Sequence, residues 1–323
     1  MKSKITPIYI LLVTIFTGCN SGIFIEDFIT DIPDTCKVEK DKAYKLHFDT
    51  EEWDILNVYS TKSMLLDIYE LDGKTKKDYL PLENGENAII SYEDTYCRFR
   101  IEKRNSQEME IICDKNLNNS PMNLSIEVGN KYVRKTIKVS LKPTEKFVID
   151  RVEYDFENDF YHNTDIVEQV DGITVNNTES SEGSITLNFY PYKNSKRRIK
   201  FYPDNYEIFN NLDKILGENL AEIQIPDIVE GKPVVQKTKV TFGLLEQSFW
   251  TGKLDRNLVV QETVNPGETK NIEIYNKIEE FHVNYKVHIS NPATGEKYIF
   301  TGRLNSMDPF GYRIIYPIDD KNV

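Results

Sequence analysis

Cys19 lies at the end of a segment whose composition predicts covalent modification of its thiol. It follows a basic N-terminal region with two lysines, an apolar run over residues 8–16 and the two small residues Thr17 and Gly18. A charged tip, a short apolar run and a small-residue cleavage site, in that order, are typical of a secretory signal. Residues 1–18 are therefore predicted to be a signal peptide that is removed on export.

The sequence of residues 16–19, Phe-Thr-Gly-Cys, resembles the bacterial lipobox. The resemblance implies a lipoprotein whose first mature residue, Cys19, carries diacylglycerol and an amide-linked fatty acid such as palmitate. Two or more acyl chains bind a bilayer stably, so we expect the protein to be anchored in the outer membrane or at the cell surface. The alternative is an anchored protein that faces the periplasm. Residues 19–41 would be the lipidated N-terminus and tether. A plain secretory signal and a transmembrane helix, which needs about 20 apolar residues, stay open as alternatives.

A second candidate for chemistry is a basic and aromatic stretch inside an otherwise acidic chain. Flat aromatic rings stack on the C–H surfaces of sugars, and arginine binds acidic or hydroxylated groups. The stretch predicts a ligand-contacting surface, and its alternative is two strands around a charged turn, with the rings in the core. The candidate residues are Tyr190, Tyr192, Arg197, Arg198, Tyr202 and, farther along the chain, Trp250.

Two further cysteines lie in neighbouring segments, 96–102 and 108–113, in which apolar and polar residues alternate; a polar turn separates the two segments. Strand side chains alternate between faces, so both segments read as strands with an apolar odd-numbered face. A hairpin in which residue numbers sum to 210 would place Cys97 opposite Cys113. Such a pair would be either two buried thiols or a cross-strand disulfide in an oxidising compartment, with Cys36 left over.

Several classes of function lack support in the sequence. A formal net charge of −12 over 323 residues disfavours nucleic-acid binding, because the neutralisation of phosphates supplies most of that affinity. The cysteine spacing matches no zinc pattern, and no catalytic or phosphate-binding motif is found. We therefore expect no enzyme, no cofactor and no bound metal.

The elements that must position these residues are predicted to be β-strands. Short alternating segments and closely spaced turn signals favour an all-β fold with two antiparallel β-sandwich domains. The first domain, 42–143, is expected to be immunoglobulin-like, and the second β-rich domain spans 146–317. Within the second domain, the capping pattern from Asp204 to Glu207 and apolar residues at helical spacing predict one short helix that ends at Gly217.

The first domain resembles the BACON family of bacterial carbohydrate-associated domains. The resemblance is carried by Cys97–Lys103, Met109–Ile112, Asn116–Ser120 and Met122–Val139. It implies an immunoglobulin fold and a role in binding carbohydrate.

A stretch of the second domain is similar to aerolysin-like β-pore-forming proteins, over Thr263–Thr269, Ile272–Tyr275, Val283–Val287 and Thr301-Gly302. That family inserts a Ser/Thr-rich alternating hairpin into membranes. Thr174–Thr186 is rich in such residues here but does not alternate regularly.

These observations together predict a membrane-anchored envelope lipoprotein that acts as a non-catalytic binding module. Its partners would be the membrane, through the lipid, and a glycan or an envelope protein. Two alternatives remain: an aerolysin-like pore-forming or antagonistic protein, and a structural subunit of an envelope assembly.

Overall fold

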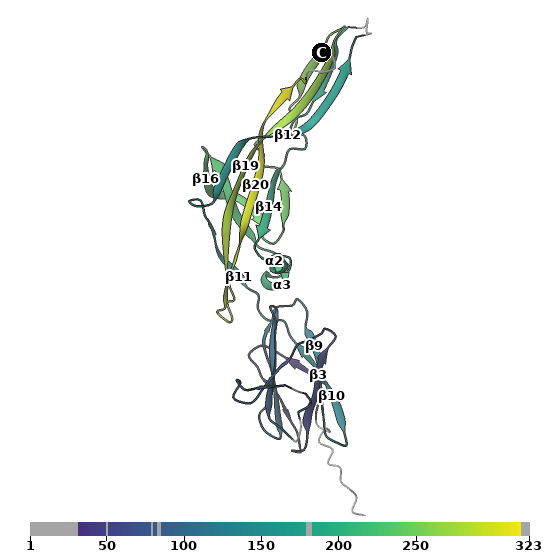
Figure 1. Ribbon diagram of the computed structural model, residues 1–323, viewed down its shortest axis with the longest axis vertical. Coiled ribbons are helices and arrows are strands. Elements are labelled where there is room, and N and C mark those ends of the chain that lie inside the picture. Colours follow the sequence, from purple (N-terminus) through teal and green to yellow (C-terminus); the bar gives the residue numbers. More distant parts are fainter. Residues whose placement is uncertain (1–31, 50, 79, 83–84, 179–182, 318–323) are drawn as a thin grey trace, which may run out of the picture. The chain divides into compact units, whose positions relative to one another are not determined.

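The computed structural model describes residues 32–317 except 50, 79, 83–84 and 179–182 (Figure 1). The predicted signal peptide and Cys19 lie outside the described residues. Internal contacts divide the chain into two compact units, with the division between Thr144 and Glu145. Both units are built almost wholly from β-strands, which confirms the all-β prediction.

The first unit is a sandwich of two sheets around one core. A four-stranded sheet has the order β1 (Thr35–Val38), β10 (Arg134–Leu141), β9 (Met122–Gly129) and β3 (Asp54–Ser60). The six-stranded sheet has the order β2 (Tyr44–His47), β8 (Glu108–Asn116), β7 (Cys97–Lys103), β6 (Ala88–Glu93), β4 (Asp67–Tyr69) and β5 (Lys76–Lys77). Buried apolar residues of both sheets form a single cluster, as expected for an immunoglobulin-like sandwich. One pair departs from the antiparallel pattern, because β1 runs parallel to β10.

A buried lysine joins the two sheets at the edge of this core. The Lys103 ammonium donates to the Trp53 carbonyl at 2.5 Å and lies 4.3 Å from the centre of the Trp53 ring. Its nearest counter-charge is Asp54, at 3.6 Å. Burial lowers the pKa of Lys103, because removal from water disfavours the charged form.

The register predicted between β7 and β8 is wrong. Phe99 lies opposite Cys113, and Cys97 lies opposite Asn116, so the two cysteines do not face each other. An extra residue, Asp114, bulges from β8 and shifts the pairing at that end. Alternation fixes which face a side chain occupies, but registers that differ by two residues preserve that face equally well.

The three described cysteines are free and buried. Burial raises the pKa of Cys97 to about 12 and the pKa values of Cys36 and Cys113 to about 11. Since the thiolate is the reactive form, these thiols are poorly placed to react in the folded protein.

The second unit is organised around a sheet of unusually long strands (Figure 1). Its order is β11 (Val148–Tyr154), β19 (Thr269–Ser290), β20 (Lys297–Ile315), β14 (Arg197–Pro203) and β17 (Glu246–Phe249), and β12 (Phe160–Asn176) also pairs with β19. At roughly 3.3 Å per residue, β19 is about 70 Å long. Two smaller two-stranded sheets complete the unit: β13 (Ile185–Phe189) with β18 (Val260–Val264), and β15 (Glu222–Val229) with β16 (Lys232–Thr241).

The predicted single helix is two short helices, α2 (Tyr206–Phe209) and α3 (Leu212–Leu216). Asn205, not Asp204, caps α2 by accepting from the Ile208 amide at 3.0 Å. The Asn211 side chain donates to the Glu207 carbonyl at 2.8 Å. Asparagine side chains compete with the helical backbone in this way, which accounts for the interruption between α2 and α3.

The long sheet is covered by two separate groups of apolar residues. A cluster of rings, with centroids 5.3 to 6.2 Å apart, joins Phe201, Phe209, Phe242, Tyr285 and Phe300. Other apolar side chains of the unit outside the second group are also fully buried, among them Leu212, Ile223, Ile225, Val240, Val283 and Leu304. The second group, called here the satellite core, has four buried residues, Phe189, Val264, Ile272 and Ile274, with Val175, Leu187 and Ile314 half-buried against them. The two ends of the sheet therefore rest on very different amounts of packing.

Gly302 allows close passage of three strands in this sheet. A Cβ added there would lie 2.5 Å from the Tyr202 carbonyl oxygen and 2.7 Å from the Tyr285 hydroxyl oxygen. Its backbone is not in the left-handed region, so the constraint is space alone.

Gly302→Ala is expected to lower the free energy of unfolding of the second unit by about 1–3 kcal/mol, as overpacking does. Urea unfolding followed by Trp250 fluorescence in a Trp53→Phe background would measure it. Gly311→Ala is the matched control, because the nearest atom to its Cβ would be 3.5 Å away on the Lys277 side chain. Equal unfolding curves for the two variants would contradict this role of Gly302.

Candidate functional site

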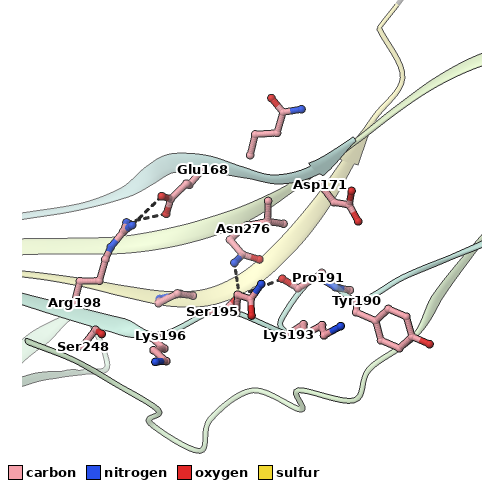
Figure 2. Close-up of a pocket in the computed structure, with 14 residues that line it drawn as sticks. Glu168, Asp171, Tyr190, Pro191, Lys193, Ser195, Lys196, Arg198, Ser248 and Asn276 are labelled. Carbon is pink, nitrogen blue, oxygen red and sulfur yellow. Dashed lines mark hydrogen bonds and ion pairs between the residues drawn. The ribbon is translucent and has the colours of Figure 1, made fainter. Parts of the chain in front are cut away.

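A polar pocket of about 510 Å³ opens on the second unit (Figure 2). One wall comes from β12, with Glu168 and Asp171, and another comes from the turn between β13 and β14, with Tyr190 and Lys193. Asn276 of β19 also lines it. Glu168 and Asn276 are directly paired across β12 and β19, so the ladder of the long sheet positions this part of the pocket.

The predicted aromatic and basic surface is divided by the structure. Tyr190, 47% exposed, and Arg198 both reach the pocket. Tyr192 is only 7% exposed, and its ring packs edge-on against Tyr312 with centroids 5.7 Å apart. The prediction that Tyr192 contacts a ligand is therefore wrong, because the core takes the ring.

Arg197 is also corrected, because it is a buried structural residue with 2% exposure. Its guanidinium donates to the Ser306 hydroxyl at 2.9 Å and to the Pro226 carbonyl at 2.8 Å, and it forms an ion pair with Asp227. Each of the three guanidinium nitrogens therefore donates one hydrogen bond, and these contacts join β14, β15 and β20. Neighbouring strand residues face opposite sides of a sheet, so Arg197 is buried while Arg198 faces the pocket.

Tyr202 and Trp250 lie outside the lining of the pocket. Tyr202 borders a separate hollow of about 380 Å³, between Lys200 and Arg303, whose charges are each 5.3 Å from its ring centre. The Arg256 guanidinium lies 3.8 Å from the centre of the Trp250 ring, and the Lys196 ammonium lies 5.7 Å from the same ring centre. Lys196 does line the pocket, so Trp250 adjoins it through that side chain.

The charges in the pocket are only partly paired. Arg198 holds Glu168 through two hydrogen bonds of 2.8 and 2.7 Å (Figure 2). Among the described residues, no carboxylate lies within 4 Å of Lys193 or Lys196, and no cation lies that close to Asp171. Within the described part of the chain, the pocket therefore presents two ammonium groups without a carboxylate partner and one carboxylate without a cationic partner.

Asn276 adds a buried polar group that is not satisfied. Its side chain is 2% exposed and its amide nitrogen donates to the Ser195 hydroxyl. Its Oδ1 has no hydrogen-bond partner in the described part of the chain. Buried polar atoms are nearly always paired, so this oxygen is unusual.

The arrangement is suited to non-covalent binding by hydrogen bonds and ion pairs. No cluster of three or more metal-ligating side chains occurs in the described ranges. Sequence reasoning named Tyr190 and Arg198, which lie in one basic and aromatic stretch, but it did not select Lys193 or Lys196 of the same stretch as candidates. It missed Glu168, Asp171 and Asn276, which reach the pocket only through strand pairing.

A second candidate feature is an amphipathic pair of segments, called here the arms. The first arm is the end of β12, where Ile173 and Val175 alternate with Thr174 and Asn176. The second arm is β13, whose apolar residues Ile185, Leu187 and Phe189 alternate with Thr186 and Asn188.

The apolar faces of the two arms are only partly covered. Ile173 is 45% exposed and Ile185 is 37% exposed, while Phe189 is buried in the satellite core. The alternation was missed in the sequence because a bulge at Val170 reverses the phase of β12 just before the first arm. No helix in the described residues is long and apolar enough to cross a bilayer.

Comparison with known proteins gives fold similarity only. No protein-family model and no curated protein matches the chain. Among solved structures, the chain is similar to a lamprey immune protein at 11% identity, covering 87% of this chain and 96% of that one, with a TM-score of 0.33. It is similar to an aerolysin-like protein of Bombina maxima at 12% identity, covering 52% and 95%, with a TM-score of 0.24. Parasporin-2 of Bacillus thuringiensis, described as a toxin that recognizes cancer cells, matches at 11% identity over 61% and 75%, with a TM-score of 0.17. At these TM-scores we rest no functional conclusion on the matches.

Proposed function

We propose that this chain is a non-catalytic, membrane-permeabilising β-protein in which the two arms leave the satellite core and insert into a bilayer. The observation that carries the proposal is the alternation of apolar and polar side chains in both arms over a core of few residues. A β-strand that spans a membrane needs one face for lipid and one for water, and each arm has both.

The packing that restrains the arms is small. Phe189 is the arms' one fully buried apolar residue, and Val175 and Leu187 are half-buried. At about 1.5–3 kcal/mol for a fully buried side chain, the loss of this apolar burial costs on the order of 5 kcal/mol. Release also breaks the pairing of the first arm with β19 and of β13 with β18. Insertion would bury the apolar faces of both arms, including Ile173 and Ile185, in hydrocarbon and offset that cost.

The length and the hydrogen bonding of the arms set further conditions. A membrane-spanning strand needs about 9–11 residues. The alternating parts of the arms, 173–176 and 185–189, are shorter than that, so each spanning strand would have to extend beyond them along the chain. Unpaired backbone groups in hydrocarbon cost several kcal/mol each. The arms must therefore pair with arms of other copies, so the proposal includes oligomerisation at the membrane.

The proposal also retains lipid attachment at Cys19, supported by the lipobox-like sequence at 16–19. An acylated N-terminus would hold the chain at an outer membrane or cell surface. The arms would then meet lipid at a high effective concentration, since a tether makes the second encounter intramolecular.

Locking the first arm to β19 should block dye release from vesicles. Thr174 and Asn271 are direct partners across β12 and β19, and Thr174→Cys with Asn271→Cys would cross-link them. The oxidised variant of residues 20–323 is expected to release no calcein from phosphatidylethanolamine–phosphatidylglycerol vesicles, and reduction is expected to restore release.

The matched control for this experiment is Lys286→Cys with Thr301→Cys, which cross-links β19 to β20 away from the arms. This pair should leak equally in both redox states. The proposal fails if the unaltered chain releases no dye, or if the oxidised Thr174–Asn271 pair releases it as fast as the reduced one.

Lipid attachment has its own test in a bacterial host fed labelled palmitate. The full chain is expected to incorporate the label and sediment with membranes, and Cys19→Ala is expected to lose both properties. Cys36→Ala should keep the label, because that thiol is buried in the first unit. Label retained in Cys19→Ala would exclude this residue as the acylation site.

A further inference from the structure

We propose that the pocket lined by Tyr190, Lys193 and Lys196 binds a carboxylated sugar, such as a uronic acid unit of an acidic glycan. This inference goes beyond membrane insertion and rests on separate residues. It concerns the binding of a glycan on a target surface, a step that would come before the arms insert into the membrane.

The positive charge of the pocket is available to a ligand. Lys193 and Lys196 have no carboxylate within 4 Å among the described residues, whereas Arg198 is already held by Glu168. A ligand carboxylate beside the Lys193 ammonium would form charge-assisted hydrogen bonds, which are about twice as strong as neutral ones, and Lys196 would add a second positive charge to the lining of the pocket.

Tyr190 supplies an aromatic surface beside these charges. Its ring is 47% exposed, and the Lys193 ammonium lies 5.9 Å from the ring centre. A pyranose ring stacked on Tyr190 would therefore carry its carboxylate within reach of Lys193. Figure 2 shows Tyr190 and Lys193 on the same segment that borders the pocket.

Acceptors for hydroxyl groups complete the site. The Ser195 hydroxyl donates to the Pro191 carbonyl at 3.1 Å and accepts from the Asn276 amide. This leaves the Asn276 Oδ1 without a donor in the described residues. A water molecule that also binds a sugar hydroxyl would satisfy that oxygen. Asp171 offers its Oδ2 as a second acceptor, because its Oδ1 already accepts from the Gly172 amide at 2.8 Å.

The mixture of charges favours a sugar acid over a phosphate. A phosphate monoester carries nearly two negative charges at neutral pH and would be repelled by Asp171 and Glu168. A sugar acid carries one negative charge and several hydroxyl donors, which match the two lysines and the free acceptors. The volume of about 510 Å³ lies within the ~300–1,000 Å³ range of small-molecule sites.

Calorimetry with the chain of residues 20–323 would test this inference, using methyl β-glucuronide, methyl β-glucoside and glucose 6-phosphate as probes. The glucuronide is expected to bind about tenfold more tightly than the neutral glucoside, the equivalent of one ion pair of about 1.4 kcal/mol. Lys193→Gln with Lys196→Gln should abolish that preference, and Tyr190→Ala should weaken both sugars.

Lys237→Gln is the matched control, because Lys237 is exposed on β16 and lies outside the pocket. It should leave all affinities unchanged. The inference is overturned if no sugar binds, if the glucoside binds as tightly as the glucuronide, or if the phosphate binds most tightly. Binding is measured without vesicles, so this test can fail while dye release persists, and the reverse.

Discussion

The antiparallel pairing of β19 with β20 determines the arrangement of the second unit. It runs from Glu273 opposite Ile315 to Ser290 opposite Lys297. One end of the ladder lies among the large aromatic cluster around Tyr285, and Gly302 lets β14 approach there. The other end extends to Ile272 and Ile274, which have only the satellite core as cover. The same pair of strands therefore provides a firmly packed body and a weakly packed end, and the arms lie at the weakly packed end.

A single bulge connects the pocket with the arms. Before Val170, Glu168 pairs with Asn276, and both line the pocket. After it, Ile173 pairs with Ile272 of the satellite core. Because Val170 is an extra residue, the even-numbered residues of β19 lie opposite even-numbered residues of β12 just before it and opposite odd-numbered residues after it. The pocket, which Glu168 and Asp171 line, and the first arm, which begins at Ile173, therefore adjoin each other on one strand.

The sequence was sufficient where a pattern is local and insufficient where strands from distant parts of the chain meet. Alternation at Phe99, Ile101 and Ile111 identified a sandwich, because burial on one face requires it. The same alternation could not choose between registers that differ by two residues, so Cys97 was paired with the wrong partner. The short helix was placed correctly but as one piece, because the Asn211 interruption depends on side-chain hydrogen bonds.

Prediction of the candidate site shows the same division. Tyr190 and Arg198 were recognisable as members of a basic, aromatic stretch, whereas Lys193 and Lys196 of the same stretch were not selected as candidates. Whether Arg197 or Arg198 faces a ligand depended on the phase of β14, which the sequence did not determine. Asn276 and Asp171 become neighbours of the stretch only through the β12–β19 ladder.

Insertion of the arms is tested most directly by an environment-sensitive fluorophore placed on single cysteines at 185, 186, 187 and 188 in turn. The thiols of Cys36, Cys97 and Cys113 are buried and free, so labelling of the chain of residues 20–323 can be confined to the introduced site. On addition of vesicles, probes replacing Ile185 and Leu187 should shift to the blue as they enter lipid, and probes replacing Thr186 and Asn188 should not. An equal response at all four positions, or none at any, would contradict insertion of β13 as an amphipathic strand.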